Sequence, residues 1–262
     1  MNWLRFSIEA RRIKDTTSLL KLLIVSSVFD TSTGVFSGFI TVYFAKYLEE
    51  ELGFGDWAYG VILSIAITLY LVTVIVSGAL SDDLRSDRWG NRVPLIMVGG
   101  GLMGLIFILA YGVLSIFEAN LFIIIILFGG IYIAYGIFSS PNNALMSELF
   151  EKHMRGWSAL ARMVFGGLGS GIAIVVFPGL ADSGNYETIL IIIAVVLFIC
   201  SGLVALFVPK LNPDFDPDET ISDIINTPRY LATYGRGDFG KLMVCQVFWS
   251  LGTGAVYYFW AA

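Results

Sequence analysis

Residues 22–40 read LLIVSSVFDTSTGVFSGFI, and this stretch is long and apolar enough to cross a bilayer. It nevertheless carries Asp30 near its middle. An ionised carboxylate at that depth costs roughly 2.5–3.5 kcal/mol on insertion scales. The stretch therefore predicts a membrane helix whose one carboxylate has a partner or a task that offsets this cost.

The rest of the chain has the same apolar character. Hydrophobic residues make up 56% of the 262 residues and charged residues only 14%, whereas a soluble domain carries about 25% charged residues. A span needs about 20 apolar residues, and seven runs have that length: 19–43, 57–80, 93–116, 121–146, 159–180, 188–208 and 241–262. We expect an all-α, multi-pass membrane protein.

The distribution of basic residues predicts the orientation. Of the 16 lysines and arginines, all but Lys46 lie on one side of the predicted spans. Positive residues accumulate in cytoplasmic loops, so the N-terminus is expected in the cytoplasm and the protein in the cell's plasma or cytoplasmic membrane. The net charge of −5 disfavours nucleic acid as a partner.

The spans suggest a domain organisation. We expect a cytoplasmic N-terminal arm at 1–18, a six-helix transmembrane bundle at 19–208, a polar cytoplasmic linker at 209–240 and a further membrane helix at 241–262. Six spans, a linker and a seventh span make an odd count. We therefore expect residues 241–262 to be the first helix of a truncated C-terminal half.

The loop after the second span carries a motif. Residues 78–96 read GALSDDLRSDRWGNRVPLI, in which Gly78 and Asp82 precede Arg88, Gly90 and Arg92. This pattern resembles the loop signature of the major facilitator superfamily. Its longer spacing looks like that of the cation-coupled glycoside symporters and plant sucrose carriers.

A second motif follows the fourth span. Residues 147–160 read SELFEKHMRGWSAL, with Glu148, six intervening residues and then Arg155. This spacing resembles the Glu-x6-Arg-Gly element of sugar porters in the same superfamily. Arginine pairs strongly with carboxylates only in the right geometry, so the two loops are expected to form a conformational latch that closes in one state and separates in another. Its members are Gly78, Asp82, Arg88, Gly90, Arg92, Glu148 and Arg155.

The resemblance implies a fold and a function. It implies two six-helix halves that rock around a midplane site, with the first, fourth and seventh spans lining the cavity. The expected function is secondary active transport by alternating access, a symport of a small polar solute, with sugar favoured, coupled to a proton or a monovalent cation. No covalent catalysis, cofactor or metal site is expected, and the complete protein is expected to be monomeric.

Polar residues recur at helical spacing in those same three spans. They are Asp30, Thr33 and Ser37 in the first span, Tyr132, Tyr135, Ser139 and Asn142 or Asn143 in the fourth, and Gln246, Ser250 and Tyr257 in the seventh. Asp30 is predicted to carry the coupling proton, contact the solute, or both, because burial disfavours its ionised form. The alternative is structural, since such side chains also join membrane helices by hydrogen bonds.

Two other functions fit parts of the sequence. A drug or metabolite exporter of the same fold would carry similar loops. A seven-helix receptor or opsin would have the same number of spans, but its N-terminus usually lies outside the cell, and no lysine lies deep in 241–262 to hold a retinal.

Overall fold

The computed structural model describes residues 16–55, 57–84, 89–116, 120–150 and 154–208. Within these ranges every regular element is a helix, and six helical stretches are long and apolar enough to cross a membrane. After the first stretch they are α3 (Trp57–Asp83), α4 (Val93–Ile116), α5 (Leu121–Leu149), α6 (Arg155–Ala181) and α7 (Tyr186–Phe207). The all-α prediction is confirmed for these spans. The predicted linker and the seventh span lie outside the described residues, as does most of the N-terminal arm.

The first stretch is longer than the sequence predicted. Helix α1 (Thr16–Gly38) continues through the π-helical turn η2 (Phe39–Tyr43), α2 (Phe44–Lys46) and a second π-helical turn, η3 (Tyr47–Glu51). Charged side chains in the last turns of a membrane helix can reach the polar interface, so they need not end the helix. Asp30 consequently lies in the first half of the span Leu20–Glu51 and not near its middle, as residues 22–40 alone had indicated.

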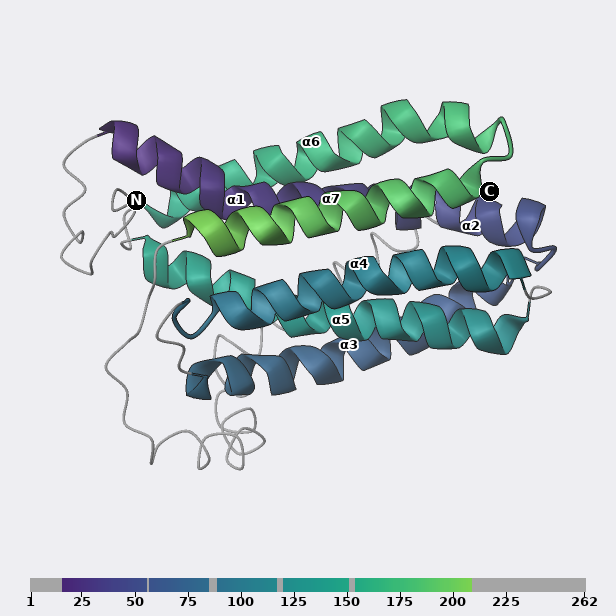
Figure 1. Ribbon diagram of the computed structural model, residues 1–262, viewed down its shortest axis with the longest axis horizontal. Coiled ribbons are helices and arrows are strands. Elements are labelled where there is room, and N and C mark those ends of the chain that lie inside the picture. The colour runs from purple at the N-terminus through teal and green to yellow at the C-terminus, as the bar shows by residue number, and fades with distance from the viewer. Residues whose placement is uncertain (1–15, 56, 85–88, 117–119, 151–153, 209–262) are drawn as a thin grey trace, which may run out of the picture. The chain divides into compact units, whose positions relative to one another are not determined.

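The helices pack in a continuous series (Figure 1). Helix α1 packs against α6 on one side and α7 on the other, α4 packs against both α7 and α5, and α3 packs against α5. Figure 1 shows α6, α1 and α7 in one layer and α4, α5 and α3 in the other. Helices α5 and α6 touch only slightly, and the hydrogen bond between Arg162 and Asn143 described below joins them.

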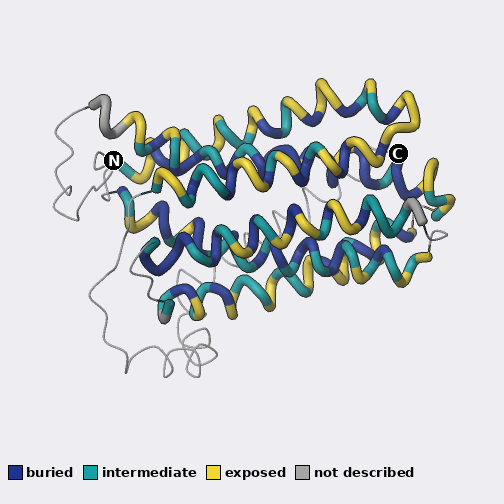
Figure 2. Tube along the Cα trace, in the orientation of Figure 1, coloured by how far each residue is buried: buried dark blue, intermediate teal, exposed yellow. Residues whose placement is uncertain are grey.

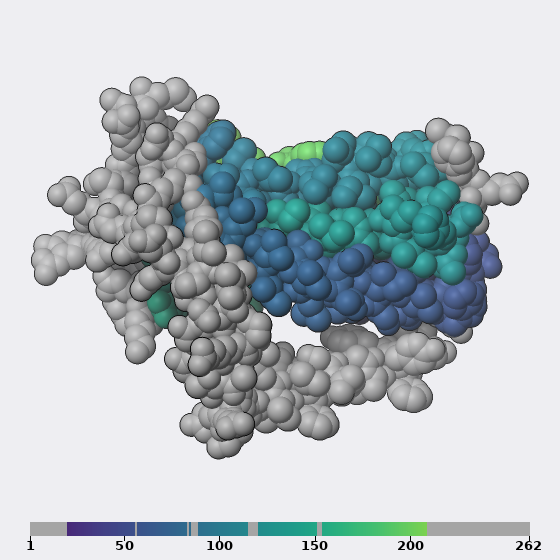
Figure 3. Space-filling model, turned by 90° about the horizontal axis from the view of Figure 1, so that it is seen from below, coloured from purple at the N-terminus to yellow at the C-terminus, as the bar shows by residue number. Residues whose placement is uncertain are grey.

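Aromatic side chains fill the space between the layers. Phe29, Phe36 and Phe39 of α1 and η2 are almost fully buried, and Phe29 packs edge-on against Phe138 of α5 with ring centroids 4.5 Å apart. Of the six spans, the first is the most buried, whereas α3 and α6 are the least (Figure 2). Helix α3 contributes to the face seen in Figure 3. Apolar side chains exposed on α3 and α6 suit contact with lipid.

Candidate functional site

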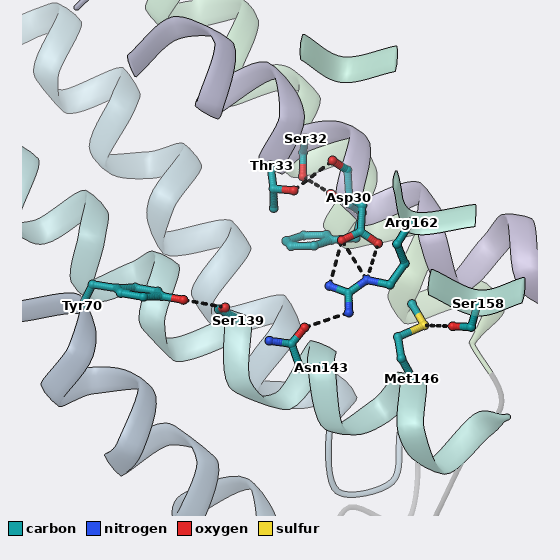
Figure 4. Close-up of polar contacts among 10 residues, drawn as sticks. Asp30, Ser32, Thr33, Tyr70, Ser139, Asn143, Met146, Ser158 and Arg162 are labelled. Carbon is teal, nitrogen blue, oxygen red and sulfur yellow. Dashed lines mark hydrogen bonds and ion pairs between the residues drawn. The ribbon is translucent and has the colours of Figure 1, made fainter. Parts of the chain in front are cut away.

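Asp30 of α1 is paired with Arg162 of α6 (Figure 4). The Nε of Arg162 donates to Oδ2 of Asp30 at 3.0 Å and to Oδ1 at 3.2 Å, and Nη2 donates to Oδ1 at 3.0 Å. The Asp30 side chain is 9% exposed and that of Arg162 27%. A guanidinium that meets a carboxylate along two parallel N–H bonds makes one of the strongest polar contacts in proteins. This pair answers how a carboxylate is accommodated in the span.

The opposite edge of the guanidinium contacts α5. Nη1 of Arg162 donates to Oδ1 of Asn143 at 2.8 Å, so the three residues join α1, α6 and α5. Figure 4 shows Asp30 and Asn143 on opposite sides of the guanidinium. We call Asp30, Arg162 and Asn143 the Arg162 cluster.

Small residues bring α1 and α6 close enough for this pairing. A methyl group at Gly34 of α1 would overlap the carbonyl oxygen of Gly166, and one at Gly169 of α6 would overlap that of Thr31. Ser170 also donates from Oγ to the carbonyl of Gly34 at 3.1 Å. Such close backbone approach is typical of small-residue helix interfaces in membranes. It holds the helix carrying Arg162 at a fixed distance from the helix carrying Asp30.

The other predicted residues of the first span are placed differently from one another. Thr33 is half-buried and its Oγ1 donates to the backbone carbonyl of Asp30 at 2.9 Å. Ser37 is exposed on the same helix. Of these three residues, all within the described part of the chain, Asp30 alone pairs with a charged side chain of another helix.

The predicted tyrosines of α5 belong to an aromatic group beside the Arg162 cluster. Tyr132 and Tyr135 both pack against Phe36 of α1, with ring centroids 5.7 Å apart in each case. Tyr135 stacks on Tyr70 of α3 at 4.9 Å, and the Tyr70 hydroxyl hydrogen-bonds to Oγ of Ser139 at 3.1 Å. Tyr135 lies within electrostatic reach of both Asp30 and Arg162.

Of the two asparagines that the sequence left open, Asn142 is not the one that joins the cluster. It is buried, and its Oδ1 has no hydrogen-bond partner. The next residue, Asn143, is exposed and contacts Arg162. Adjacent residues on a helix point about 100° apart, so an offset of one position changes which helix a side chain faces.

A second polar cluster joins the ends of α3, α4 and α5. Nη2 and Nε of Arg92 donate to Oε1 of Glu148 at 2.6 and 3.0 Å, and Nη1 contacts Asp82 and Ser81. Burial by itself would lower the pKa of Arg92, but pairing with Glu148 and Asp82 outweighs this effect and raises the pKa above its ordinary value. The guanidinium of Arg92 therefore stays protonated. We call Arg92, Glu148, Asp82 and Ser81 the Arg92 cluster.

The remaining predicted latch residues have separate positions. Gly90 has a φ of +77°, which side chains rarely adopt, and a methyl group at Gly78 would lie 2.7 Å from Oγ of Ser140. Arg155 donates from Nη2 to the backbone carbonyl of Ser147 at 3.2 Å, so its hydrogen bond goes to the backbone and not to Glu148. Arg88 lies outside the described residues, as do Gln246, Ser250 and Tyr257.

Two residues of the site were missed from the sequence, Arg162 and Tyr70, and Asn143 was not distinguished from Asn142. The predicted span 159–180 puts Arg162 in its first turn, whereas α6 begins at Arg155 and places Arg162 two turns inside the helix. One signal in the sequence could have found Arg162: it lies seven residues, or about two helical turns, after Arg155, and the apolar run of the span directly follows it. Within the described ranges, no group of three or more His, Cys, Asp or Glu side chains could hold a metal ion.

Comparison with known proteins identifies the class of protein. The family model of the Major Facilitator Superfamily matches residues 20–262. The chain therefore belongs to the major facilitator superfamily and is a membrane transporter of that type. This assignment decides against the seven-helix receptor alternative. No curated protein matched the chain.

Proposed function

We propose that the protein is a secondary active transporter that takes up a small polar solute, with sugars favoured, together with a proton or a monovalent cation. The observation that carries this proposal is the ion pair between buried Asp30 and partly buried Arg162, beside the stacked rings of Tyr70 and Tyr135. Adjacent hydroxyl groups match a carboxylate and a guanidinium, each of which forms two parallel hydrogen bonds. Tyrosine rings offer an apolar surface with polar edges for the rest of a ring-shaped solute.

Asp30 supplies the coupling in this proposal. While it is ionised, Asp30 engages two nitrogens of Arg162. A proton on Asp30 neutralises it and weakens the pair, which leaves Arg162 a partly buried cation that lacks its counter-charge. Such a cation is costly, so protonation of Asp30 favours binding of a solute oxygen to Arg162. Asp30 then releases its proton on the other side of the membrane, which restores the pair with Arg162 and displaces the solute.

The Arg92 cluster supplies the conformational step. It ties α3 and α5 to the segment leading into α4 through one guanidinium. We place this end of the bundle on the cytoplasmic side, with the N-terminus, because nearly all basic residues lie on that side of the spans. The cluster stabilises the state closed to the cytoplasm and separates when that side opens. The protein acts as a monomer in the cell membrane.

Counterflow in liposomes tests the proposal. The purified protein is reconstituted into liposomes, which are preloaded with one unlabelled compound. The compounds tested are neutral monosaccharides, neutral disaccharides and hydrophobic organic cations, and entry of the same labelled compound is followed. We expect counterflow with a sugar and acceleration of net uptake by an inward proton or sodium gradient. Counterflow with hydrophobic cations alone would instead support the exporter alternative and contradict the symport of a polar solute.

A further inference from the structure

Sequence spacing left Asn142 and Asn143 as alternatives, and Asn143 is the α5 residue that binds Arg162. The two helices carrying Asp30 and Arg162 are held at close range by Gly34, Gly169 and Ser170. Helix α5 touches α6 only slightly. The contact between Arg162 and Asn143 therefore joins a tightly packed helix pair to a neighbour that packing alone holds less firmly.

The geometry of Arg162 depends on both of its edges. A guanidinium is planar, and its N–H groups point in fixed directions. With Nη1 on the amide oxygen of Asn143, the Nε and Nη2 edge faces Asp30. Arginine is a long, flexible side chain, and 27% of it is exposed here, so without Asn143 the guanidinium gains orientations in which it no longer meets Asp30 squarely.

We propose that Asn143 is a positioning residue that holds Arg162 against Asp30 and thereby sets how readily Asp30 takes up a proton. This inference rests on the proposed function, in which Asp30 carries the coupling proton. A firmly paired guanidinium favours the ionised carboxylate. Loosening the pair therefore lets Asp30 protonate at higher pH.

Few other groups face Asp30 from the helices around it. Helix α6 contributes Arg162, α5 contributes Tyr135, and α3 contributes Tyr70 behind Tyr135. Helix α7 contributes Cys200, which lies beside Ser32, and the titratable residue of α4, Tyr111, lies in its last two turns. Arg162 is the one cation in this set, so its placement dominates the protonation of Asp30 among the described residues.

Infrared titration of the purified protein tests the inference without any solute. The carbonyl stretching band of a protonated carboxyl group is followed against pH, and the band lost in Asp30→Asn belongs to Asp30. We expect Asn143→Ala to raise the midpoint of this band by about one pH unit. Ser147→Ala is the matched control one turn further along α5, because its Oγ donates to the Ala144 carbonyl of its own helix; its midpoint should equal that of the wild type.

A second comparison separates positioning from a general structural effect. If Asn143 acts through Arg162, Asn143→Ala should not move the midpoint when Arg162 is already Gln. An unchanged midpoint in Asn143→Ala, or an equal shift with and without Arg162, would overturn the positioning role while leaving Asp30 as a proton carrier. Absence of any Asp30 band across the pH range in which the protein is folded would instead contradict the proposed coupling role, and the inference with it.

Discussion

The carboxylate of Asp30 accepts hydrogen bonds from both Nε and Nη2 of Arg162, although 132 positions separate the two residues in the chain. The pair spans the interface between α1 and α6, where glycines allow the two backbones to approach closely. A charge that would be costly in an isolated helix is therefore compensated by one on its neighbour.

Removing one member of this pair should destabilise the protein more than removing both. Asp30→Asn leaves a cation without its partner and Arg162→Gln leaves an anion, whereas the double variant leaves neither. Breaking a buried pair from one side costs about 3–5 kcal/mol in well-buried cases, and we expect a coupling free energy of about 1–3 kcal/mol because Arg162 is partly exposed. The measurement is a double-mutant cycle on the free energy of unfolding in detergent micelles.

An exposed ion pair provides the control for this cycle. Lys46 and Asp182 are 3.6 Å apart, with side chains 42% and 73% exposed, so their coupling should stay within about 1 kcal/mol. Additive effects of the Asp30 and Arg162 substitutions, equal to those at the control pair, would contradict a stabilising contact between them.

Two glycines of α6 test the close contact between α1 and α6. A methyl group at Gly169 would overlap backbone atoms of α1, whereas one at Gly167 meets nothing within 4 Å. Gly169→Ala should therefore cost about 1–3 kcal/mol through overpacking. Gly167→Ala should be neutral or stabilise by up to about 1 kcal/mol because alanine favours the helix. Thermal unfolding measures both, and equal melting temperatures for the two variants would refute the close helix contact.

The Arg92 cluster predicts a defect in rate with little change in folding. Asp82→Asn removes one ion pair of the cluster and Arg92→Gln removes the guanidinium at its centre. Because the cluster lies at the helix ends, both variants should leave expression and solute affinity near wild type. Counterflow should slow by about tenfold, which corresponds to about 1.4 kcal/mol. Arg155→Gln should slow it by less than about twofold, because its hydrogen bond goes to a backbone carbonyl. Equal effects of Arg155 and Arg92 would support the larger latch expected from the sequence over the smaller cluster.

The sequence predicted the helices more fully than the contacts between them. Apolar runs of the required length indicated all six spans that the structure describes, because span length is a local property. Asp30 stood out because a single carboxylate in an apolar run is unusual. The loop motifs indicated Asp82, Arg92 and Glu148, and the structure brings these three together.

The partner of Asp30 could not be predicted in the same way. Helical periodicity shows which residues share a face, but not which face of a distant helix lies opposite. The predicted fifth span starts four residues too late, which puts Arg162 at the end of the span near the membrane surface, where a basic residue needs no partner. Asn142 and Asn143 could not be told apart for a similar reason, since both fit a polar stripe and only the packing of α5 against α6 distinguishes them.

The most direct test of the coupling role is proton-driven uptake by Asp30→Asn. The variant keeps the size of the side chain and hydrogen-bonding atoms but cannot carry a proton. In proteoliposomes with an imposed inward proton gradient, we expect Asp30→Asn to lose accumulation of the solute identified by counterflow while it still exchanges that solute across the membrane. Accumulation at the wild-type level in this variant, with equal protein in the membrane, would contradict the central role given to Asp30.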